Sequence, residues 1–396
     1  MSATERLYHS DSMRLRFTGR VIAHDRWGDA PSVILDRTAF YPEAGGQMAD
    51  RGRLGGAAIL DVQVDDAGRV HHVLDGATPA IGAEVEGEID KERRRVHMAL
   101  HTGQHMLSRA LADLAQAATV SSRLGESACT IDVDQEVVEE RRIAAAEDLV
   151  NAIVDDDVEV RAFFPTSEEL ALLPLRRRPT VTENIRVVSI GDFDVSPCGG
   201  THCTRTAQVG LVHVTGVERY KGKIRISFSA GPRARRELSA HAVTLRGLGR
   251  DLSCDALLVP QGLAKLREEL SGSRDALGKM RGRLAEAIAA SLAANRPDAT
   301  SPIVAQIDEA PVDLLRSIAT RLAADPSALV ILGGRTAEGT SVLVTRGASS
   351  AADCGAILKR LAAAAGGRGG GRKEHAEGKL PSGADFEAAA RSALAT

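Results

Sequence analysis

Short segments in which apolar and polar residues alternate dominate residues 1–90 and predict β-strands. The stretch 15–22 combines such alternation with an apolar run. Turn-forming residues interrupt the pattern at 25–28 and again at 65–68. Short strands separated by glycine and aspartate turns are typical of small barrels and sandwiches, so we expect a small β-barrel over residues 1–90.

The apolar spacing changes to a helical period at residue 91 and predicts a helix over 91–117. Beyond it, strand patterns occupy 128–133, 185–190 and 223–229, and a second helical pattern occupies 136–154. This mixture predicts an α+β domain over residues 91–232.

Residues 233–300 carry leucines that recur every seven positions in two runs, separated by Pro260 and Gly262. A helical hairpin or short coiled coil would bury such a stripe and would serve as a linker or as the contact of a homodimer. Two ordinary amphipathic helices packed on a domain explain it equally well, because the runs are short and Ser273 interrupts the second seam. The repeated residues are Leu238, Leu245 and Leu252, then Leu263, Leu270, Leu277 and Leu284, with Leu266 and Met280 on the second seam position.

Residues 301–396 form the last part of the chain. Strand patterns at 328–332 and 340–345 precede a helical pattern at 351–364, a glycine-rich run at 366–373 and a final helix at 385–394. This order predicts a small α/β domain that contains a glycine-rich loop, and a flexible linker is the alternative reading of the glycines. The predicted fold class is thus α+β in four parts: a β-barrel, an α+β domain, a helical hairpin and a small α/β domain.

The overall composition is that of a globular protein. Hydrophobic residues make up 43% and charged residues 26%, a balance that argues against disorder. No apolar run reaches the roughly 18 residues of a membrane span, and the first 17 residues contain no apolar signal stretch. We therefore expect a cytoplasmic protein.

Charge, aromatic content and cysteines narrow the function classes. A net charge of −3 means that a nucleic acid would have to bind a local basic face. Aromatic residues at 3% argue against extensive base stacking. Five scattered cysteines without a C-x-x-C pair fit reduced thiols, some of them metal ligands, better than a disulfide scaffold.

The sharpest chemical feature is the histidine pair His101 and His105 within the predicted helix 91–117. Residues four apart lie on the same helix face, so the two imidazoles can chelate one metal ion. An incidental pair is the alternative, because such short motifs are common.

A second feature is the segment Cys198-Gly199-Gly200-Thr201-His202. A thiolate and an imidazole four residues apart converge only where the chain turns tightly, which the two glycines permit. A glycine turn between strands with a buried cysteine is the structural alternative. Cys203 is expected to point away from His202 in an extended segment and is treated as a bystander.

Together the two segments supply three histidines and one cysteine, and zinc accepts this ligand set in tetrahedral geometry. We therefore predict one Zn²⁺ per chain, held by His101, His105, Cys198 and His202. Four protein ligands describe a closed structural site, whereas catalytic zinc keeps an open position, and the sequence leaves this choice open.

Residues 36–47 read Asp-Arg-Thr-Ala-Phe-Tyr-Pro-Glu-Ala-Gly-Gly-Gln and follow no periodic pattern. A hairpin loop packed on two aromatic residues is the structural alternative. The tripeptide Gly45-Gly46-Gln47 invites comparison with the loop of peptide release factors, but it follows a short turn rather than a long loop, and we reject that reading. A glutamine on permissive backbone can nevertheless position water against an ester, which makes Gln47 a candidate catalytic residue.

The segment 36–47 with Asp50 and Gly52 resembles the N-terminal signature of the alanyl-tRNA editing proteins (the AlaX family), which also precedes the editing site of alanyl-tRNA synthetases. His101 to His105 and Cys198 to His202 match the metal-ligand motifs of that family in order and spacing. Residues 366–372 resemble the glycine loop of the DHH-associated domain found in synthetases and long AlaX forms. The resemblance covers nearly the whole chain, with two departures: Ser121-Ser122-Arg123 lies where synthetase relatives often carry glutamine, and residues 374–378 match loosely.

The resemblance implies an ATP-independent hydrolase that removes serine, and also glycine, from mischarged tRNA(Ala). Residues 1–90 are too short for an aminoacylation core, so a stand-alone trans-editing enzyme is expected. The zinc ion would orient the substrate or activate water. Backbone N–H groups of Gly199 and Gly200 would stabilise the oxyanion, and Thr38 and Thr201 are the expected substrate contacts.

tRNA(Ala) is the expected partner despite the acidic balance. The basic residues expected to contact phosphates are Arg176, Arg177, Arg178, Lys221, Lys223, Arg368 and Arg372, with solvated surface as the alternative for each cluster. A homodimer through the hairpin or the C-terminal domain is a further expectation. Two other functions compete: a zinc-stabilised tRNA-binding protein without catalysis, and a metal-dependent hydrolase of small esters or amides.

Overall fold

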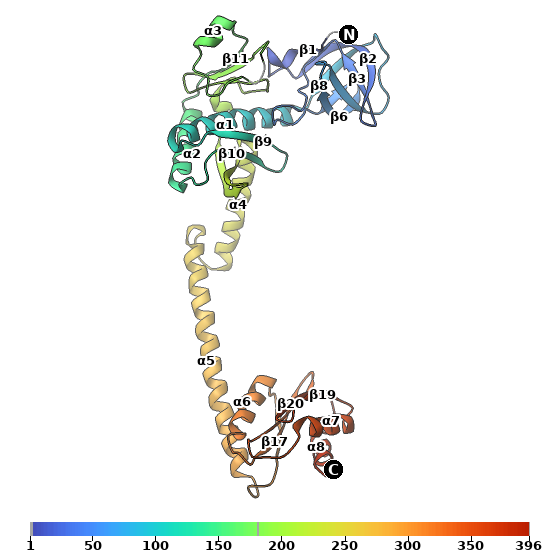
Figure 1. Ribbon diagram of the computed structural model, residues 1–396, viewed down its shortest axis with the longest axis vertical. Coiled ribbons are helices and arrows are strands. Elements are labelled where there is room, and N and C mark those ends of the chain that lie inside the picture. The colour runs from blue at the N-terminus through green and yellow to red at the C-terminus, as the bar shows by residue number, and fades with distance from the viewer. Residues whose placement is uncertain (1–2, 180–181, 396) are drawn as a thin grey trace. The chain divides into compact units, whose positions relative to one another are not determined.

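Two compact units, residues 1–246 and 247–396, make up the computed structural model, which describes residues 3–179 and 182–395 (Figure 1). Both units contain helices and sheets, and the predicted α+β class is confirmed. In the described part of the chain, no helix has the length and apolar character needed to cross a membrane.

Six strands of the first unit close into a barrel, in the order β2 (Arg16–Trp27), β3 (Ala30–Leu35), β7 (Val70–Asp75), β6 (Ala57–Val64), β5 (Gly52–Leu54), β8 (Glu84–Ile89). Alternate residues of β8 are buried, as expected for a strand with one face on a core. Gly87 is required on this face because a Cβ there would overlap the ring of Phe17. The short strand β1 (Glu5–Arg6) pairs in parallel with β4 (Arg37–Thr38) beside the barrel and leads into the 3-10 turn η1 (Leu7–His9).

The helix α1 (Lys91–Ala115) follows the barrel directly and begins where the Asp90 carboxylate accepts a hydrogen bond from the Arg93 N–H. It packs with α2 (Glu140–Asp155) and a four-stranded sheet, in the order β14 (Val212–Tyr220), β15 (Lys223–Ala230), β10 (Cys129–Val133), β9 (Thr119–Leu124). A second sheet holds β11 (Val160–Phe163), β12 (Val187–Ile190) and β13 (Asp194–Pro197), with the helix α3 (Ser167–Leu172) between β11 and β12 and the 3-10 turn η2 (Thr206–Gln208) after β13.

The second unit is built on a five-stranded sheet, in the order β16 (Ile303–Asp308), β17 (Leu329–Thr336), β18 (Gly339–Arg346), β20 (His375–Leu380), β19 (Arg368–Gly371). The strand β17 shows why both faces are covered: Val330 and Leu332 belong to one apolar cluster and Ile331 to another. One cluster includes α5 (Val259–Ala294) and α6 (Val312–Leu322), and the other includes α7 (Cys354–Ala364) and α8 (Phe386–Leu394).

The glycine-rich run 366–373 differs from its prediction as a loop or linker. Residues 368–371 form the edge strand β19, paired antiparallel with β20. Glycine makes this possible because a Cβ at Gly371 would overlap Ala376 of β20, and one at Gly369 would lie 2.6 Å from the Cα of Gly378. Because its glycines have no side chains, β19 can approach β20 closely. The run therefore forms an edge strand and not a loop.

The heptad leucines divide between α4 (Gly231–Asp251) and α5, with the 3-10 turn η3 (Ala256–Leu258) between them. Pro260 lies in the first turn of α5, where a missing N–H has no helical partner to lose. The apolar stripe on α5 is 40–68% exposed. It consists of Leu263, Leu266, Leu270, Leu277, Met280 and Leu284. Both predicted helices are present. That a second copy of the chain covers the leucine stripe stays a prediction.

Candidate metal centre

Two distant segments bring three imidazoles and one thiol together. His101 and His105 project from α1, while Cys198 and His202 lie on the loop after β13. The four potential ligand atoms lie within 4.8 Å of one another, and Cys198 Sγ is 3.4 Å from His101 Nε2 and 3.3 Å from His202 Nε2. The predicted convergence is confirmed, and the cluster can hold a metal ion.

Each histidine is oriented by a different partner at its other ring nitrogen. His101 Nδ1 donates to Gln47 Oε1 at 2.7 Å, and His202 Nδ1 lies 3.2 Å from Thr102 Oγ1. His105 Nδ1 lies 3.4 Å from Asp194 Oδ2, a contact rather than a well-aligned hydrogen bond. Such outer partners fix the tautomer, so the Nε2 atoms are left for a metal ion.

The electrostatics of the cluster favour metal-binding protonation states. Burial raises the pKa of the Cys198 thiol, but the three imidazoles outweigh burial and hold that pKa well below its ordinary value. Burial, helped by His101, lowers the pKa of His202 to about 3. Burial also opposes protonation of His105, yet Cys198 and Asp194 raise its pKa. A thiolate beside a neutral imidazole is the state that a metal ion requires.

The two glycines of the loop have different surroundings. A Cβ at Gly200 would overlap the His101 ring and lie 3.0 Å from Gln47 Oε1, whereas a Cβ at Gly199 would meet nothing within 4 Å. The Gly200 N–H points to Cys198 Sγ at 3.4 Å. Gly200 therefore lets the loop close on a ligand ring, and Gly199 is the exposed member of the pair.

Gln47 is fully buried behind His101. Its Oε1 also accepts from the Thr201 N–H at 3.2 Å, and its Nε2 donates to Thr201 Oγ1 at 2.8 Å. The preceding Gly46 has φ +85° and passes so close to β9 that a Cβ would lie 2.6 Å from the Ser122 carbonyl oxygen. Gly45 and Gly46 thus place Gln47 beside the metal centre, where its side chain orients His101.

An ion pair that the sequence analysis missed joins the barrel to α1. Arg94 and Asp50 are both buried, and the Arg94 guanidinium bonds the Asp50 carboxylate and the carbonyl oxygens of Ser12 and Ala39. The same carboxylate accepts from the Tyr41 N–H at 2.7 Å. Arg94 stands in the charged run 91–95 at the start of the helix, so nothing in the sequence marks it as buried. The pair fixes the segment 36–50, and with it Gln47, against the helix that carries His101.

Arg186 is a second missed residue and holds the metal loop from outside. It is 5% exposed, and its Nη1 donates to the carbonyl oxygens of Cys198 at 3.0 Å and Gly200 at 2.8 Å. Its Nε donates to the His9 carbonyl oxygen at 3.2 Å. Asp194 is the third missed residue: its carboxylate accepts from Arg176 Nε at 2.7 Å and faces His105. Neither residue stands in a recognisable motif.

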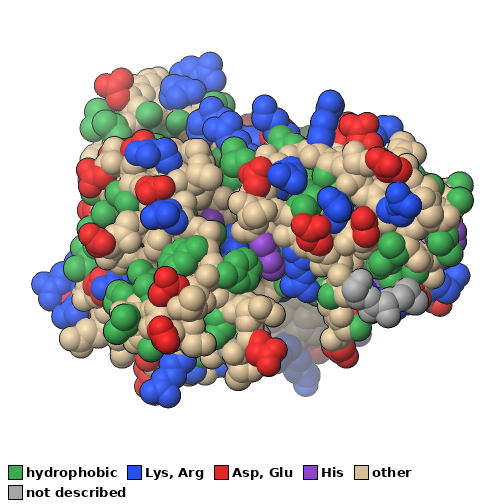
Figure 2. Space-filling model, turned by 90° about the horizontal axis from the view of Figure 1, so that it is seen from above, with side chains coloured by type: hydrophobic (Ala, Val, Ile, Leu, Met, Phe, Trp, Pro, Cys, Tyr) green, Lys and Arg blue, Asp and Glu red, His purple; other side chains and the backbone are tan. Residues whose placement is uncertain are grey.

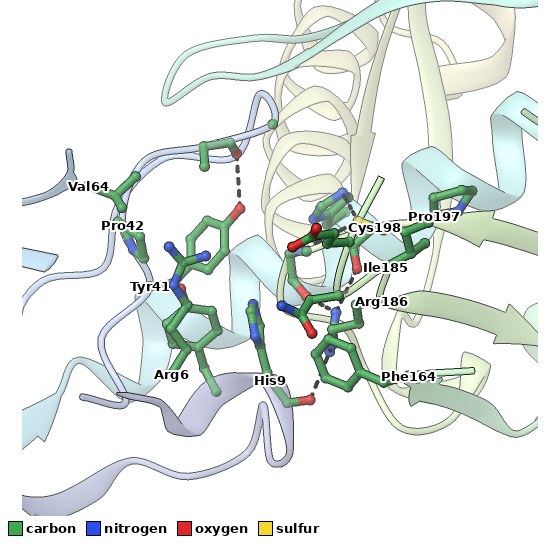
Figure 3. Close-up of a pocket in the computed structure, with 18 of the residues that line it drawn as sticks. Arg6, His9, Tyr41, Pro42, Val64, Phe164, Ile185, Arg186, Pro197 and Cys198 are labelled. Atoms are coloured by element: carbon green, nitrogen blue, oxygen red, sulfur yellow. Dashed lines mark hydrogen bonds between the residues drawn. The ribbon is translucent and has the colours of Figure 1, made fainter. Parts of the chain in front are cut away.

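A cavity of about 810 Å³ opens beside the metal centre, within the first unit (Figure 3). Its wall includes His101, Cys198, Gly199 and Gly200, so a bound molecule can reach the cluster. Tyr41 and His9 also line it. The space-filling view shows histidine side chains in a hollow of this face, with Lys and Arg side chains around it (Figure 2).

The two predicted substrate threonines lie outside this wall. Thr38 is fully buried beside the barrel; its Oγ1 lies 2.8 Å from His72 Nε2 and accepts from the Phe40 N–H at 3.1 Å. Thr201 is fully buried as well and engages Gln47. Both hydroxyls are therefore already hydrogen-bonded inside the protein.

The predicted tRNA contacts are divided over the molecule. Arg176 is paired with Asp194 and is 11% exposed, so it supports His105 rather than offering a free cation. Arg177 lines the cavity and Arg178 is exposed next to it. Lys221 and Lys223 lie at the β14–β15 turn, and Arg368 and Arg372 are exposed at β19 in the second unit.

Comparison with known proteins agrees with this architecture. The family described as "Threonyl and Alanyl tRNA synthetase second additional domain" matches residues 185–227, which include Cys198 and His202. "tRNA synthetases class II (A)" matches residues 8–93, and the "DHHA1 domain" matches residues 300–396. Three separate segments of the chain thus match known domain families, and two of these families are described by aminoacyl-tRNA synthetases.

The chain also matches the long form of the alanyl-tRNA editing proteins. It is 36% identical over 238 residues to "Alanyl-tRNA editing protein AlaX-L" of Pyrococcus horikoshii, which covers 58% of this chain and 59% of that protein. It is 31% identical over 398 residues to "Alanine--tRNA ligase" of Archaeoglobus fulgidus, covering 96% of this chain and 42% of the ligase. The corresponding ligase of Methanopyrus kandleri is 31% identical over 391 residues, with 95% and 42% covered. The chain spans less than two thirds of the length of each of these relatives.

Proposed function

We propose that this protein hydrolyses the ester that links a wrong amino acid to the terminal ribose of tRNA(Ala), with serine as the main amino acid and glycine as the second. The observation that carries the proposal is the cluster of three imidazoles and one thiolate, because it opens on a cavity large enough for a ligand of that size. The similarity to a long alanyl-tRNA editing protein supports the choice of substrate.

The residues present fit zinc. Three neutral nitrogen ligands and one thiolate suit its preference for mixed N/S donors, and each imidazole is already oriented by Gln47, Thr102 or Asp194. His101, His105, Cys198 and His202 would hold the ion. When bound, zinc supplies Lewis-acid chemistry, which polarises an ester carbonyl and lowers the pKa of water.

The chain's own groups supply the rest of the proposed chemistry. Gly200 directs its N–H to the Cys198 sulfur, so we assign the oxyanion contact to the exposed Gly199 rather than to both glycines. Gln47 acts by holding His101 in register, in place of the water-positioning role expected from sequence. Because Thr38 and Thr201 are satisfied internally, the serine hydroxyl would find its partner among cavity-lining groups such as Ser122 and Gln104.

The partner is proposed to be tRNA(Ala), and basic residues of both units would contact its phosphates. Arg178, Lys221 and Lys223 serve this role in the first unit and Arg368 and Arg372 in the second. The exposed leucine stripe of α5 supports a homodimer as the assembled form.

The function is tested by deacylation of tRNA(Ala) charged with serine, glycine or alanine, with zinc content measured in parallel. We expect release of serine and glycine and sparing of alanine. Cys198→Ala should lower turnover and zinc occupancy by roughly a hundredfold or more, beyond the effect typical of an outer partner. Cys203→Ala is the matched control, because Cys203 is a buried neighbour outside the cluster. Equal hydrolysis of alanine, or full activity of Cys198→Ala, would refute the proposal.

A further inference from the structure

A second cavity, of about 210 Å³, lies within the first unit. None of its lining residues belongs to the wall of the cavity beside the metal centre. Three segments that are distant in the sequence form it: Met13 and Leu15 precede β2, Met98 lies in α1, and Cys203 directly follows His202. This cavity is therefore a separate site, and the proposed reaction does not use it.

Much of the wall of this cavity is apolar. Met98 and Cys203 are 3% and 4% exposed, and Leu15 packs against the apolar cluster of the barrel. Burial raises the pKa of the Cys203 thiol to about 11, so this group is uncharged near pH 7. Thioether and neutral thiol side chains behave as soft apolar groups. Because an apolar cavity of about 150 Å³ can bind benzene, this one accepts the body of a single ring or of a short branched chain.

The wall also contains three cations and, among the described residues, no carboxylate. Arg94 is buried and already paired with Asp50. Lys91 and Arg95 are exposed and stand four residues apart in the first turns of α1, which places them on one face of that helix. In the part of the chain that the structure describes, neither of these two cations forms an ion pair, whereas Arg93 between them does. An anion can therefore bind both of them without displacing a carboxylate.

We infer that this cavity binds a small carboxylate with an apolar body, such as an aromatic or a branched aliphatic acid. The body would lie against Met13, Met98 and Cys203, and the carboxylate would bind Lys91 and Arg95. A carboxylate suits these cations because the guanidinium fork of arginine matches its two oxygens. The volume excludes drug-sized ligands, which occupy about 300–1,000 Å³. The inference goes beyond the proposed function, because it involves no metal ligand and no part of the cavity beside the metal centre.

Cys203 connects this cavity with the loop Cys198–His202. Its N–H donates to Thr102 Oγ1 at 3.1 Å, and the same oxygen lies 3.2 Å from His202 Nδ1. A ligand in the cavity would therefore contact three segments that unfolding separates. Because it would bind the folded form alone, it should stabilise the first unit.

The methionines of the chain report binding directly. The experiment uses the full-length protein, labelled with ¹³C in its methionine methyl groups, and sodium benzoate as the probe. Of the six methionines, Met13 and Met98 line the cavity and Met280 lies on α5 in the second unit. Benzoate should shift the NMR signals of Met13 and Met98 with one common Kd and leave that of Met280 unchanged. No saturable shift at Met13 and Met98, or an equal shift at Met280, would overturn the inference.

Two further probes separate the charge of the ligand from its apolar body. Benzamide has the same ring without the charge and should bind about four- to twenty-five-fold more weakly, because each of two exposed ion pairs contributes about two- to fivefold. Acetate has the charge without the ring and should give no saturable shift. Benzamide binding as tightly as benzoate would mean that the cavity takes any apolar group, including a side chain of a partner protein. Acetate binding as tightly would mean an anion site only, and either outcome contradicts the inference.

Lys91→Gln and Arg95→Gln test the two cations. Each should weaken benzoate binding by about two- to fivefold and leave benzamide binding unchanged. Arg51→Gln is the matched control, because Arg51 is exposed and lies outside the wall. Unaltered benzoate binding in both cation variants would refute the carboxylate contacts.

Met13→Ala tests the apolar contact. Met13 is 50% exposed, so the first unit should still fold. The variant should weaken benzoate and benzamide binding by the same factor, measured at the signal of Met98. Leu60→Ala is the control, because Leu60 is a 53% exposed apolar residue on β6 outside the wall. Unchanged affinity for both probes in Met13→Ala would place the ring elsewhere and contradict the inference.

Calorimetry of the full chain tests the stabilisation. At a benzoate concentration of about ten times Kd, the unfolding equilibrium constant of the first unit should fall by about elevenfold. That of the second unit should not change, because the cavity lies in the first unit. An equal effect on both units would mean that benzoate acts without a specific site and would overturn the inference.

Discussion

Two glycine-rich segments, the loop Cys198–His202 and the strand β19, use the same residue for different physical reasons. In the loop, Gly200 leaves room for the ring of His101 and Gly199 faces open space. In β19, Gly371 leaves room for the backbone of β20 and Gly370 faces open space. Each segment therefore contains at least one glycine that cannot accept a side chain and a neighbour that can.

This comparison shows that the role of a glycine is decided by what a Cβ would touch. At Gly200 the obstacle is a metal ligand, so a side chain would disturb the chemistry of the site. At Gly371 the obstacle is a neighbouring strand, so a side chain would disturb the stability of the second unit. The sequences Gly-Gly-Thr and Gly-Gly-Gly do not distinguish these cases, since neither shows the neighbour across space.

The largest effect is expected from Gly200→Ala. Its Cβ would overlap the His101 ring, which is held in place by Gln47 and cannot retreat without losing that bond. We expect zinc affinity and deacylation to fall by more than about a hundredfold, because a ligand itself is displaced. Zinc affinity is measured by competition with a chelator.

Gly199→Ala is the matched control for this prediction. It changes the same loop by the same methyl group in open space, so zinc affinity should stay within about twofold of wild type. Equal losses in the two variants would mean that loop flexibility, rather than contact with His101, explains the glycines.

Asp194→Asn should have the next largest effect. The substitution keeps the shape of the side chain but removes the charge that faces His105 and pairs with Arg176. Removal of such an outer partner typically costs about 10–100-fold in metal affinity. Asp192→Asn, an exposed neighbour, is the control and should leave chelator competition unchanged. An unaltered zinc affinity in Asp194→Asn would show that Asp194 only anchors Arg176.

Gly371→Ala tests the other half of the comparison. Overlap with Ala376 should lower the free energy of unfolding of the second unit by about 1–3 kcal/mol, the usual cost of overpacking. Gly370→Ala should be within about 0.5 kcal/mol of wild type. Calorimetry of the full chain measures both, and zinc affinity should be the same in the two variants. A lower zinc affinity in Gly371→Ala would contradict the assignment of β19 to stability and of the Cys198–His202 loop to metal binding.

Local pattern in the sequence predicted the elements better than the contacts. The strands β10 and β15 follow from periodicity, because alternate residues are buried along β10 and along the first part of β15. The helix that bears His101 was predicted from its helical spacing, although residues 97–108 are buried on every side. The ligand set followed from residue chemistry and spacing.

The partners of polar residues could not be predicted in this way. Thr38 was expected at the substrate but bonds His72, and Arg176 was expected at the surface but bonds Asp194. A hydroxyl or guanidinium finds its partner through tertiary packing, and the sequence carries no record of which segment lies opposite. Gln47 was predicted to position water, and its contact with His101 depends on the close approach of Gly46 to β9.

The smallest predicted effect concerns pH and again separates the two units. His72 is fully buried in the first unit, and burial lowers its pKa to about 4. Its Nδ1 donates to the Val33 carbonyl oxygen, which fixes the neutral tautomer that accepts from Thr38. Below the ordinary histidine pKa of about 6.5, the unfolded chain takes up a proton that the folded chain refuses. The stability that this residue contributes is therefore complete above pH 6.5 and is lost as pH falls toward 4.

The corresponding measurement is calorimetry of the full chain between pH 7 and pH 5, with His72→Gln compared with wild type. In wild type, the free energy of unfolding of the first unit should fall by about 1 kcal/mol more per pH unit than in the variant, the value of one proton taken up on unfolding. Equal pH slopes in wild type and His72→Gln would mean that His72 is protonated in the folded barrel. Its bond to Thr38 would then have to be reversed, and the Thr38 hydroxyl would be free to turn toward a substrate.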